Sequence, residues 1–349
     1  MSYPEIRIGR LLAGLGHPPL VVAEIGINHG GNLKVALELA ASAVKAGAKV
    51  VKHQTHIPDA EMSSEARSVI PGNADKSIYE VISENSISLE DEVVLAEYVR
   101  SLGAVYISTP FSKEAAVFLN EVVKVEAFKI GSGECNNYPL IELIADFGKP
   151  IILSTGMNSL DSIRLAVDVF RRKKTSFALL HCTNLYPTPD KLIRLNAIQE
   201  IQREFPDAVT GLSDHSLSNY PCLGAVALGA SILERHFTDS KDRIGPDIVC
   251  SMTPSELSEL IEGSAVIHST LGHGKSAVIE EAVTIAFAFS SVVSTRDILE
   301  GEFLTLENVW VKRPSGGDFK PIDLEKVLGR KARSYIPADT QIRKTQLGD

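Results

Sequence analysis

Short runs of apolar and often β-branched residues recur along the first two thirds of the chain, and each run is closed by polar residues. They predict strands at residues 20–25, 49–55, 105–109, 127–131, 151–155, 177–183, 209–214 and 232–237. The intervening segments carry apolar residues at helical spacing. Val35, Leu39 and Ala43 form the first such stripe, and Gly47 marks its end. Apolar strands that alternate with helices are typical of a parallel sheet buried on both faces.

The number of strands favours a closed barrel over an open sheet. Eight strand–helix repeats are what a (β/α)8 barrel requires. A doubly wound sheet would have fewer strands, with a G-x-G-x-x-G turn after the first. The first predicted strand is followed instead by residues 26–31, GINHGG, which do not fit that motif. The sequence therefore predicts an α/β fold with a (β/α)8 TIM barrel.

The pattern changes after about residue 285, where short apolar runs are separated by turns and no long helical period continues. We expect a TIM-barrel domain at residues 1–284, including a linker from about residue 266, and a small, mostly β domain at residues 285–349. Because a domain of this size has a thin core, it would gain stability by docking on another surface.

Composition narrows the class of protein. Of the 349 residues, 35 are Lys or Arg and 44 are Asp or Glu, which gives a net charge of −9 and argues against nucleic acid or an anionic membrane as a partner. The four cysteines form no CxxC pair and are expected to be reduced thiols. The first residues lack an apolar signal core, and no uncharged stretch reaches the roughly 18 residues of a membrane span. We expect a cytoplasmic protein.

Polar residues stand at the end of every predicted strand, which in a TIM barrel is the end that faces the active site. Any one of them alone is readily explained as a capping or turn residue, but the full set indicates a functional site. The set is Glu24, Lys52, His53, Gln54, Ser108, Thr109, Lys129, Ser132, Glu134, Ser154, Asn184, Tyr186, Ser213, Asp214, His215, Glu234, Arg235 and His236.

Two lysines, Lys52 and Lys129, lie inside apolar strands. A buried ammonium is very costly without a partner, so each should face an anion. That anion is either a carboxylate of the protein or an anionic substrate, which the hydroxyls of Ser132, Ser154 and Ser213 would help to hold. The sequence leaves both interpretations open.

His215 and His236 end the seventh and eighth predicted strands and should be neighbours in space. A single histidine is more often structural, but two imidazoles at the end of a barrel favour a divalent metal such as Mn²⁺, Co²⁺ or Zn²⁺. The other strand-end and loop histidines, His29, His53, His56 and His181, have no obvious partner in the sequence.

Several of these segments match a known family in order along nearly the whole chain. They are residues 24–29, 52–56, 70–75, 129–137, 181–189, 211–215, 234–238 and 245–247. They closely resemble the bacterial N-acetylneuraminate (sialic acid) synthases. Residues 310–314, WVKRP, resemble the antifreeze-like (SAF) module that ends members of this family.

The resemblance implies an enzyme that condenses phosphoenolpyruvate with N-acetylmannosamine and water to give N-acetylneuraminate and phosphate. It also implies a divalent metal, with Mn²⁺ the first choice and Mg²⁺ or Co²⁺ the alternatives. The expected assembly is a homodimer in which the C-terminal module of one subunit is swapped onto the barrel of the other.

The same resemblance implies roles for individual residues. Those expected to hold phosphoenolpyruvate are Lys52, Lys129, Ser132, Ser154 and Ser213, helped by Thr109 and Asn184. Those expected to contact the sugar are Glu24, Gln54, Tyr186 and Asp247, with Arg313 reaching its N-acetyl group from the partner subunit. The candidate catalytic residues are Glu24, Glu134, His215 and His236; the two histidines would hold the metal, and Glu134 would orient the attacking water.

Three alternatives remain open at this point. One is a sister synthase that makes legionaminic or pseudaminic acid, and another is a synthase for the 6-phosphorylated sugar. Residues 52–56, KHQTH, favour the unphosphorylated N-acetylmannosamine, and the sequence shows no additional basic residue for a sugar phosphate. The third is a catalytically silent sugar-binding barrel, against which the presence of Lys52, Lys129, Glu134, His215 and His236 argues.

Overall fold

The computed structural model describes residues 3–71, 75–272 and 274–348. It divides into two compact units, Met1–Gly272 and His273–Asp349. The sequence-based boundary at residues 284/285 falls inside helix α11 (Ala282–Ala288). This helix belongs to the second unit, where the carbonyl oxygen of Ala286 accepts hydrogen bonds from the backbone N–H and the hydroxyl of Ser315.

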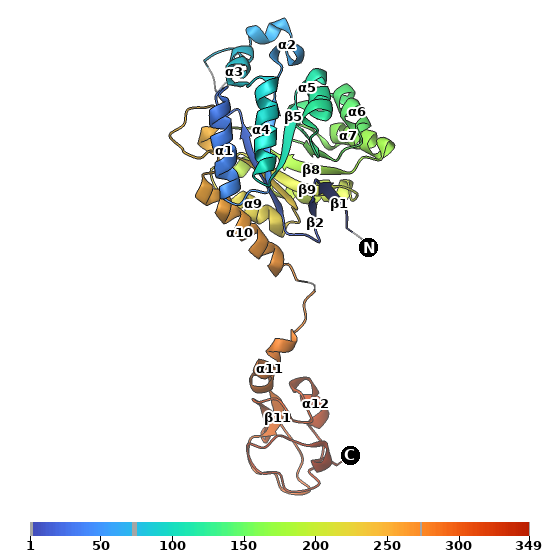
Figure 1. Cartoon of the computed structure of the whole chain (residues 1–349). Coiled ribbons are helices and arrows are strands. Elements are labelled where there is room, and N and C mark those ends of the chain that lie inside the picture. Colours follow the sequence, from blue (N-terminus) through green and yellow to red (C-terminus); the bar gives the residue numbers. More distant parts are fainter. Residues whose placement is uncertain (1–2, 72–74, 273, 349) are drawn as a thin grey trace. The chain divides into compact units, whose positions relative to one another are not determined.

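The first unit is a closed barrel of eight parallel strands in the order β10-β3-β4-β5-β6-β7-β8-β9 (Figure 1). The predicted TIM barrel is confirmed, with every predicted strand present to within one residue at each end. The strands are β3 (Leu20–Gly26), β4 (Val50–Thr55), β5 (Val105–Pro110), β6 (Phe128–Ile130), β7 (Ile151–Ser154), β8 (Phe177–Cys182), β9 (Val209–Asp214) and β10 (Ile232–His236).

Helices surround the strands, and their starts are fixed by side-chain caps: Asn32, Ser88 and Ser159 each accept a backbone N–H of the following turn. Two short helices, α2 and α3, lie between β4 and α4 and were not predicted as separate elements. The helices of this unit are α1 (Leu33–Lys45), α2 (Pro58–Glu61), α3 (Ile78–Asn85), α4 (Leu89–Ser101), α5 (Lys113–Phe118), α6 (Tyr138–Asp146), α7 (Leu160–Lys173), α8 (Asn196–Glu204), α9 (Tyr220–Ala227) and α10 (Pro254–Thr270).

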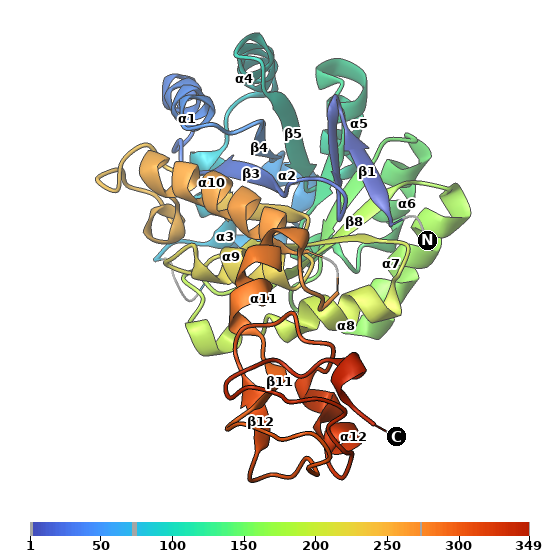
Figure 2. The same cartoon turned by 90° about the horizontal axis from the view of Figure 1, so that it is seen from below.

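An antiparallel hairpin, β1 (Glu5–Ile8) and β2 (Leu11–Gly14), precedes the barrel and was not predicted. Its alternating side chains Ile6 and Ile8 are fully buried in a cluster with the barrel-interior residues Val22, Val50 and Ile152. The hairpin therefore packs on the interior of the barrel at the amino-terminal ends of its strands, and β1 lies close to the strands in Figure 2. This leaves the opposite ends of the strands for the functional site.

The second unit contains a short antiparallel pair, β11 (Ser291–Ser294) and β12 (Val309–Lys312), together with α11 and α12 (Leu324–Val327). Isolated bridges such as Ile298–Ile336 complete a small, irregular β structure. Its core is a separate cluster of buried apolar side chains that includes Val292, Leu304 and Ile342. The expected small C-terminal module with antiparallel strands is confirmed.

Two expectations from composition can be compared with the structure. All four cysteines are buried and unpaired, in agreement with the prediction of reduced thiols. Among the described residues, no helix is both long and apolar enough to cross a membrane.

Candidate active site

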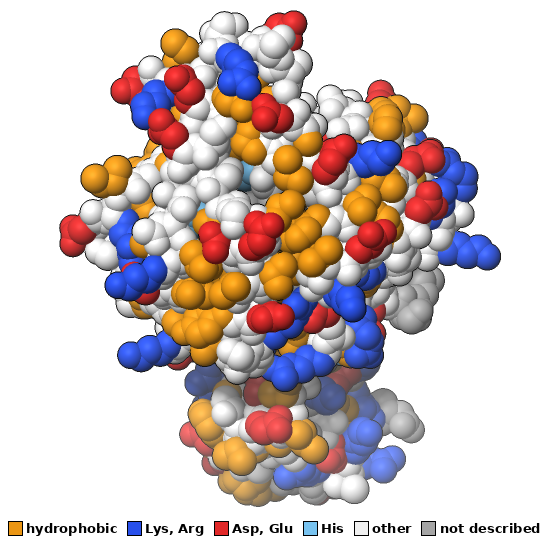
Figure 3. Space-filling view, turned by 45° about the horizontal axis from the view of Figure 1, so that its top comes forward, with side chains coloured by type: hydrophobic (Ala, Val, Ile, Leu, Met, Phe, Trp, Pro, Cys, Tyr) orange, Lys and Arg blue, Asp and Glu red, His pale blue; other side chains and the backbone are white. Residues whose placement is uncertain are grey.

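The carboxyl-terminal ends of the barrel strands enclose a cavity of about 320 Å³. Figure 3 shows histidine atoms within a hollow of this unit, with apolar side chains gathered nearby. Most of the residues predicted from the sequence line the cavity. They are Lys52, Gln54, Thr109, Lys129, Ser132, Ser154, Asn184, Tyr186, Ser213, His215, His236 and Asp247.

Lys52, which projects from β4, lies on one side of the cavity and is 4 % exposed. Its ammonium forms a close ion pair with Glu24 of β3, lies 3.8 Å from Glu234 of β10 and donates a hydrogen bond of 3.2 Å to Thr109. Burial lowers the pKa of Lys52, but the two carboxylates outweigh it and raise the pKa overall. Lys52 is therefore firmly charged before any substrate arrives.

Lys129 of β6 is the less well compensated of the two lysines. Its ammonium donates to the Ser154 hydroxyl at 2.6 Å and to the carbonyl oxygen of Ile130 at 3.1 Å, and it lies 3.7 Å from Glu234. Burial, together with repulsion from Lys52, lowers the pKa of Lys129. An anion in the cavity would therefore favour the charged form of Lys129.

Glu234 was recognised in the sequence only as a polar strand end, and the structure places it between the two lysines. It is 5 % exposed, accepts a hydrogen bond of 3.2 Å from Ser213, and has one buried oxygen without a hydrogen-bond partner. Burial raises the pKa of Glu234, but the charges of Lys129 and Lys52 outweigh burial, so the pKa is lowered overall and Glu234 is ionised. The lysines thus have protein carboxylates as neighbours, which was the first of the two interpretations left open.

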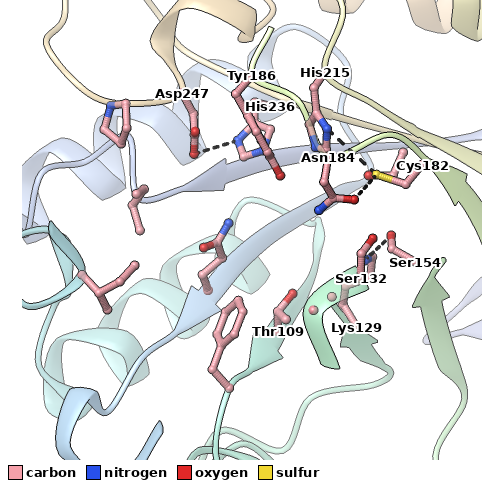
Figure 4. Close-up of a pocket in the computed structure, with 18 of the residues that line it drawn as sticks. Thr109, Lys129, Ser132, Ser154, Cys182, Asn184, Tyr186, His215, His236 and Asp247 are labelled. Carbon is pink, nitrogen blue, oxygen red and sulfur yellow. Dashed lines mark hydrogen bonds and ion pairs between the residues drawn. The ribbon is translucent and has the colours of Figure 1, made fainter. Parts of the chain in front are cut away.

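Ser132 and Asn184 crowd against the backbone after β7. The Ser132 hydroxyl accepts the backbone N–H of Gly156 at 3.0 Å. A Cβ atom at Gly156 would lie 1.9 Å from the Asn184 side-chain oxygen and 3.0 Å from the Ser132 hydroxyl, so only glycine fits. This close approach brings polar groups of three loops to the side of the cavity that holds Lys129 (Figure 4).

The other side of the cavity is formed by His215, His236, Tyr186 and Asp247, which lie together in Figure 4. The rings of His215 and His236 are 5.4 Å apart, and Tyr186 packs 4.1 Å from His215. An Asp247 oxygen lies 3.6 Å from Nδ1 of His236. Burial and the neighbouring His236 lower the pKa of His215 to about 3, so this imidazole is neutral near pH 7.

The histidine pair suits a divalent cation in its donor chemistry. Nδ1 of His215 lies 3.1 Å from the carbonyl oxygen of Thr183, which can only accept, so the ring proton is on Nδ1 and Nε2 carries a free lone pair. Nδ1 of His236 is buried without a hydrogen-bond partner. Within the described part of the chain, however, no group of three or more His, Cys, Asp or Glu side chains is arranged to hold a metal. Any further ligands would have to come from water or substrate.

Three of the predicted site residues do not line the cavity. Glu24 is buried beneath it, held by Lys52 and by a hydrogen bond of 3.0 Å from Gln54. The carboxylate of Glu134 accepts a hydrogen bond of 2.6 Å from Asn137 at the start of α6, and burial raises its pKa. Arg313 is exposed and belongs to the second unit. Residues 72–74, part of one family-like segment, lie outside the described residues.

The histidines without an assigned partner in the sequence all have one in the structure. His29 and His53 are hydrogen-bonded through their Nε2 atoms at 3.0 Å, and His53 faces the buried Glu92 at 3.4 Å. His181 bonds to the carbonyl oxygen of Ile193. His56 lines the cavity. The partners of His29, His53 and His181 are brought together by strand pairing and loop packing, which sequence spacing does not reveal.

A buried cysteine, Cys182, also lines the cavity, with its sulfur 3.4 Å from Asn184 Oδ1. Burial raises the pKa of its thiol to about 11. The thiolate is the nucleophilic form of cysteine, so this side chain is not poised for covalent catalysis.

Comparison with known proteins agrees with this geometry. The model of the NeuB family matches residues 39–276, and the model of the SAF domain matches residues 289–348. The chain belongs to the NeuB family. It is 35% identical to the N,N'-diacetyllegionaminic acid synthase of Campylobacter jejuni over 93% of this chain and 99% of that protein. It is 32% identical to the N-acetylneuraminate-9-phosphate synthase of Homo sapiens over 97% and 95% of the two chains.

One solved structure is similar to this member of the NeuB family in both fold and sequence. It is the N-acetylneuraminic acid (sialic acid) synthetase of Leptospira borgpetersenii in complex with citrate, with a TM-score of 0.74 and 32% identity. The match covers 81% of this chain and 95% of that one. The relatives thus include synthases with different sugar-acid products at nearly equal identity, and identity alone does not select one product.

Proposed function

We propose that this protein condenses phosphoenolpyruvate with N-acetylmannosamine and water, giving N-acetylneuraminate and phosphate. The observation that carries the proposal is the pair of buried lysines, Lys52 and Lys129, facing one cavity from two strands of the barrel. Cationic and hydroxyl groups on one side of the cavity suit a small polyanion, and the tyrosine, histidines and carboxylate on the other side suit a polyhydroxylated sugar.

Phosphoenolpyruvate would bind on the lysine side. The hydroxyls of Thr109, Ser132, Ser154 and Ser213 and the amide of Asn184 all line this cavity together with the lysines. Although Glu24 and Glu234 offset the lysine charges in the free protein, Glu234 lies 3.7 Å from the Lys129 ammonium, whereas Glu24 forms a close ion pair with Lys52. Arrival of a phosphate or carboxylate group would provide Lys129 with a better partner than Glu234 at 3.7 Å.

The sugar would bind in its open-chain form against Tyr186, Asp247 and Gln54. A divalent cation, with Mn²⁺ the first choice and Mg²⁺ or Co²⁺ the alternatives, would be held by His215 and His236 and would polarise the aldehyde as a Lewis acid. The protein's own residues orient the aldehyde carbon toward the enol carbon of phosphoenolpyruvate, which is the positioning part of catalysis.

The proposed reaction balances without a further reactant. The methylene carbon of phosphoenolpyruvate bonds to the aldehyde carbon, whose oxygen takes up a proton and becomes a hydroxyl. Water then adds to the former enol carbon, and the bond between this carbon and the phosphate oxygen breaks. We assign the orientation of the water to Glu134, whose raised pKa, caused by burial, suits proton transfer; because Glu134 does not line the cavity here, this role requires its carboxylate to turn inward.

We also propose that the working assembly is a homodimer with swapped C-terminal modules. The second unit exposes large apolar side chains on and beside α11, with Val283 77% and Phe287 59% exposed. The barrel unit exposes Leu217 and Tyr220 in the loop and helix after β9, the same strand that supplies Ser213. A second copy of the chain would cover both sets, and Arg313 would reach the N-acetyl group of the sugar in the partner's barrel.

A second candidate is a synthase for N,N'-diacetyllegionaminic acid. The observation in its favour is the apolar wall that α3 and the loop after β5 give the cavity through Ile78, Val81, Ile82 and Phe111. A sugar that carries two N-acetyl groups has more apolar surface than N-acetylmannosamine, and this wall would bury it. The 35% identity to the Campylobacter jejuni enzyme agrees with this candidate as well.

One assay distinguishes these candidates. The purified protein is given phosphoenolpyruvate, Mn²⁺ and, in separate reactions, N-acetylmannosamine, its 6-phosphate, and the diacetamido sugars that lead to legionaminic and pseudaminic acid. Phosphate release is followed, and the product is identified by mass. We expect N-acetylmannosamine to give the highest kcat/KM. A higher value for another sugar would overturn the assignment of substrate, and absence of phosphate release with every sugar would overturn the synthase.

A further inference from the structure

A continuous line of polar contacts runs from the lysine side of the cavity to a helix outside the barrel strands. Glu24 accepts from Lys52 and from Nε2 of Gln54, the latter at 3.0 Å. Oε1 of Gln54 lies 3.1 Å from Nε2 of His56. Nδ1 of His56 lies 3.0 Å from both carboxylate oxygens of Glu61, the last residue of α2.

The direction of each hydrogen bond in this line is fixed by its neighbours. Glu24, paired with Lys52, can only accept, so the Gln54 amide must turn its NH₂ toward Glu24 and its oxygen toward His56. Nε2 of His56 must therefore donate. Nδ1 faces the Glu61 carboxylate. The two ring nitrogens of His56 thus face acceptors on opposite sides, which fixes the orientation of the ring between Gln54 and Glu61.

The surroundings of His56 hold its ring in place. The side chains of His56 and Glu61 are 4% and 6% exposed and lie in a buried contact. The ring of Phe111 stacks on the imidazole ring with a centroid distance of 4.3 Å and an interplanar angle of 12°. Three elements, β4, α2 and the loop after β5, therefore converge on this one side chain.

We propose that His56 is a positioning residue for the sugar substrate: paired with Glu61, it holds the amide of Gln54 in the one orientation that presents a fixed pattern of donor and acceptor to the cavity. The inference rests on the proposed function, in which Gln54 contacts the sugar. It also assigns a role to α2, because Glu61 at its end anchors Nδ1 of His56. Without His56, Gln54 is held only by its hydrogen bond to Glu24, and the oxygen end of its amide loses its fixed position.

The test is a double-mutant cycle on the sugar KM, measured with whichever sugar supports turnover. His56→Ala and Gln54→Ala should each raise the sugar KM about 10-fold, the effect of one lost hydrogen bond, with the KM for phosphoenolpyruvate nearly unchanged. The double variant should be no worse than Gln54→Ala alone, because His56 acts through Gln54. Multiplied effects in the double variant would overturn the proposal.

Glu61→Gln is a second test variant. It keeps the size of the side chain, so the protein is expected to fold normally. The variant should raise the sugar KM by a similar factor, while Glu65→Gln, at an exposed position of the same segment, should leave it unchanged. Nitrogen-15 NMR of labelled histidine in the free protein, with His56→Ala to assign the signals, should show the signals of His56 shifted in Glu61→Gln and unshifted in Glu65→Gln. Unshifted His56 signals in Glu61→Gln would overturn the proposal, whereas absence of turnover with any sugar would overturn only the proposed function.

Discussion

Single residues of the cavity provide the most direct tests, and the two lysines come first. Replacing either Lys52 or Lys129 with alanine removes a charge-assisted contact to the bound anion. We expect the KM for phosphoenolpyruvate to rise roughly 10- to 150-fold, corresponding to about 1.5–3 kcal/mol, while the sugar KM changes little. Lys113→Ala, at an exposed position after β5, is the matched control. Steady-state kinetics with each substrate varied in turn measures both KM values. A rise confined to the sugar KM would show that phosphoenolpyruvate does not bind at these lysines.

Glu234 allows a test of charge balance within the same cavity. Glu234→Gln keeps the shape of the side chain but removes the carboxylate that lies 3.8 Å from Lys52 and 3.7 Å from Lys129. Because an uncompensated buried charge costs about 3–5 kcal/mol, the free variant should melt at a lower temperature than the wild type. Phosphoenolpyruvate should stabilise the variant by more degrees than it stabilises the wild type.

Thermal unfolding with and without phosphoenolpyruvate measures both effects for Glu234→Gln. The exposed Glu262→Gln on α10 serves as control. An unchanged melting temperature in the free variant would show that Glu234 does not hold the two lysines together.

At the scale of elements, the contact between the loop after β3 and strand β4 is predicted to make the barrel sensitive to acid. His29 accepts the backbone N–H of Gly31 at Nδ1 and bonds to His53 through Nε2. Burial, together with His53, lowers its pKa from 6.5 to about 3. Below pH 6.5 the unfolded chain binds a proton that folded His29 does not, so the stability it contributes is lost as the pH falls from about 6.5 toward 3.

His29→Gln should therefore weaken the pH dependence of the free energy of unfolding, by up to about 1.4 kcal/mol per pH unit below 6.5. Part of the dependence should remain, because His215 is also buried with a pKa of about 3. Denaturant unfolding between pH 7 and 4 provides the measurement, with His268→Gln at the end of α10 as control. An unaltered pH dependence in His29→Gln would contradict the lowered pKa of the buried His29.

The strands and their ends could be predicted from sequence because each barrel strand is a local apolar run with a polar end. Lys52 and Lys129 were identified as buried cations by this local signal alone. The partner of each lysine could not be predicted, since Glu24 reaches Lys52 through the pairing of β3 with β4, and Glu234 of β10 reaches Lys129 of β6 only because the barrel closes. The hairpin β1–β2 was missed for a different reason: its alternation, as in Ile6 and Ile8, extends over only four residues per strand.

At the scale of the whole molecule, metal dependence and assembly can be tested together with activity. Thorough chelation should abolish turnover, and Mn²⁺ should restore it, because His215 and His236 present two nitrogen donors to one cavity. Full activity in the chelated protein would contradict the proposal that a bound metal is required for turnover. The control is chelator already saturated with Ca²⁺, which tests whether the chelator itself inhibits.

The swapped dimer can be tested by mixing inactive chains. Arg313→Ala and His236→Ala chains each lack one component of every site. A heterodimer with swapped modules would contain one barrel that has its own His236 and receives an intact Arg313 from its partner. Co-refolding the two chains should therefore restore up to about one active site per mixed dimer. If heterodimers form and remain inactive, each module serves its own barrel.

The central claim is that the barrel joins phosphoenolpyruvate to an aldehyde sugar with cleavage of the carbon–oxygen bond to phosphate. Phosphoenolpyruvate labelled with oxygen-18 at the bridging oxygen tests this claim most directly, with both products weighed by mass spectrometry. We predict that the label leaves entirely in the released phosphate, because water supplies the new oxygen on carbon. Label retained in the sugar acid would mean that the phosphorus–oxygen bond breaks instead, and it would contradict the account.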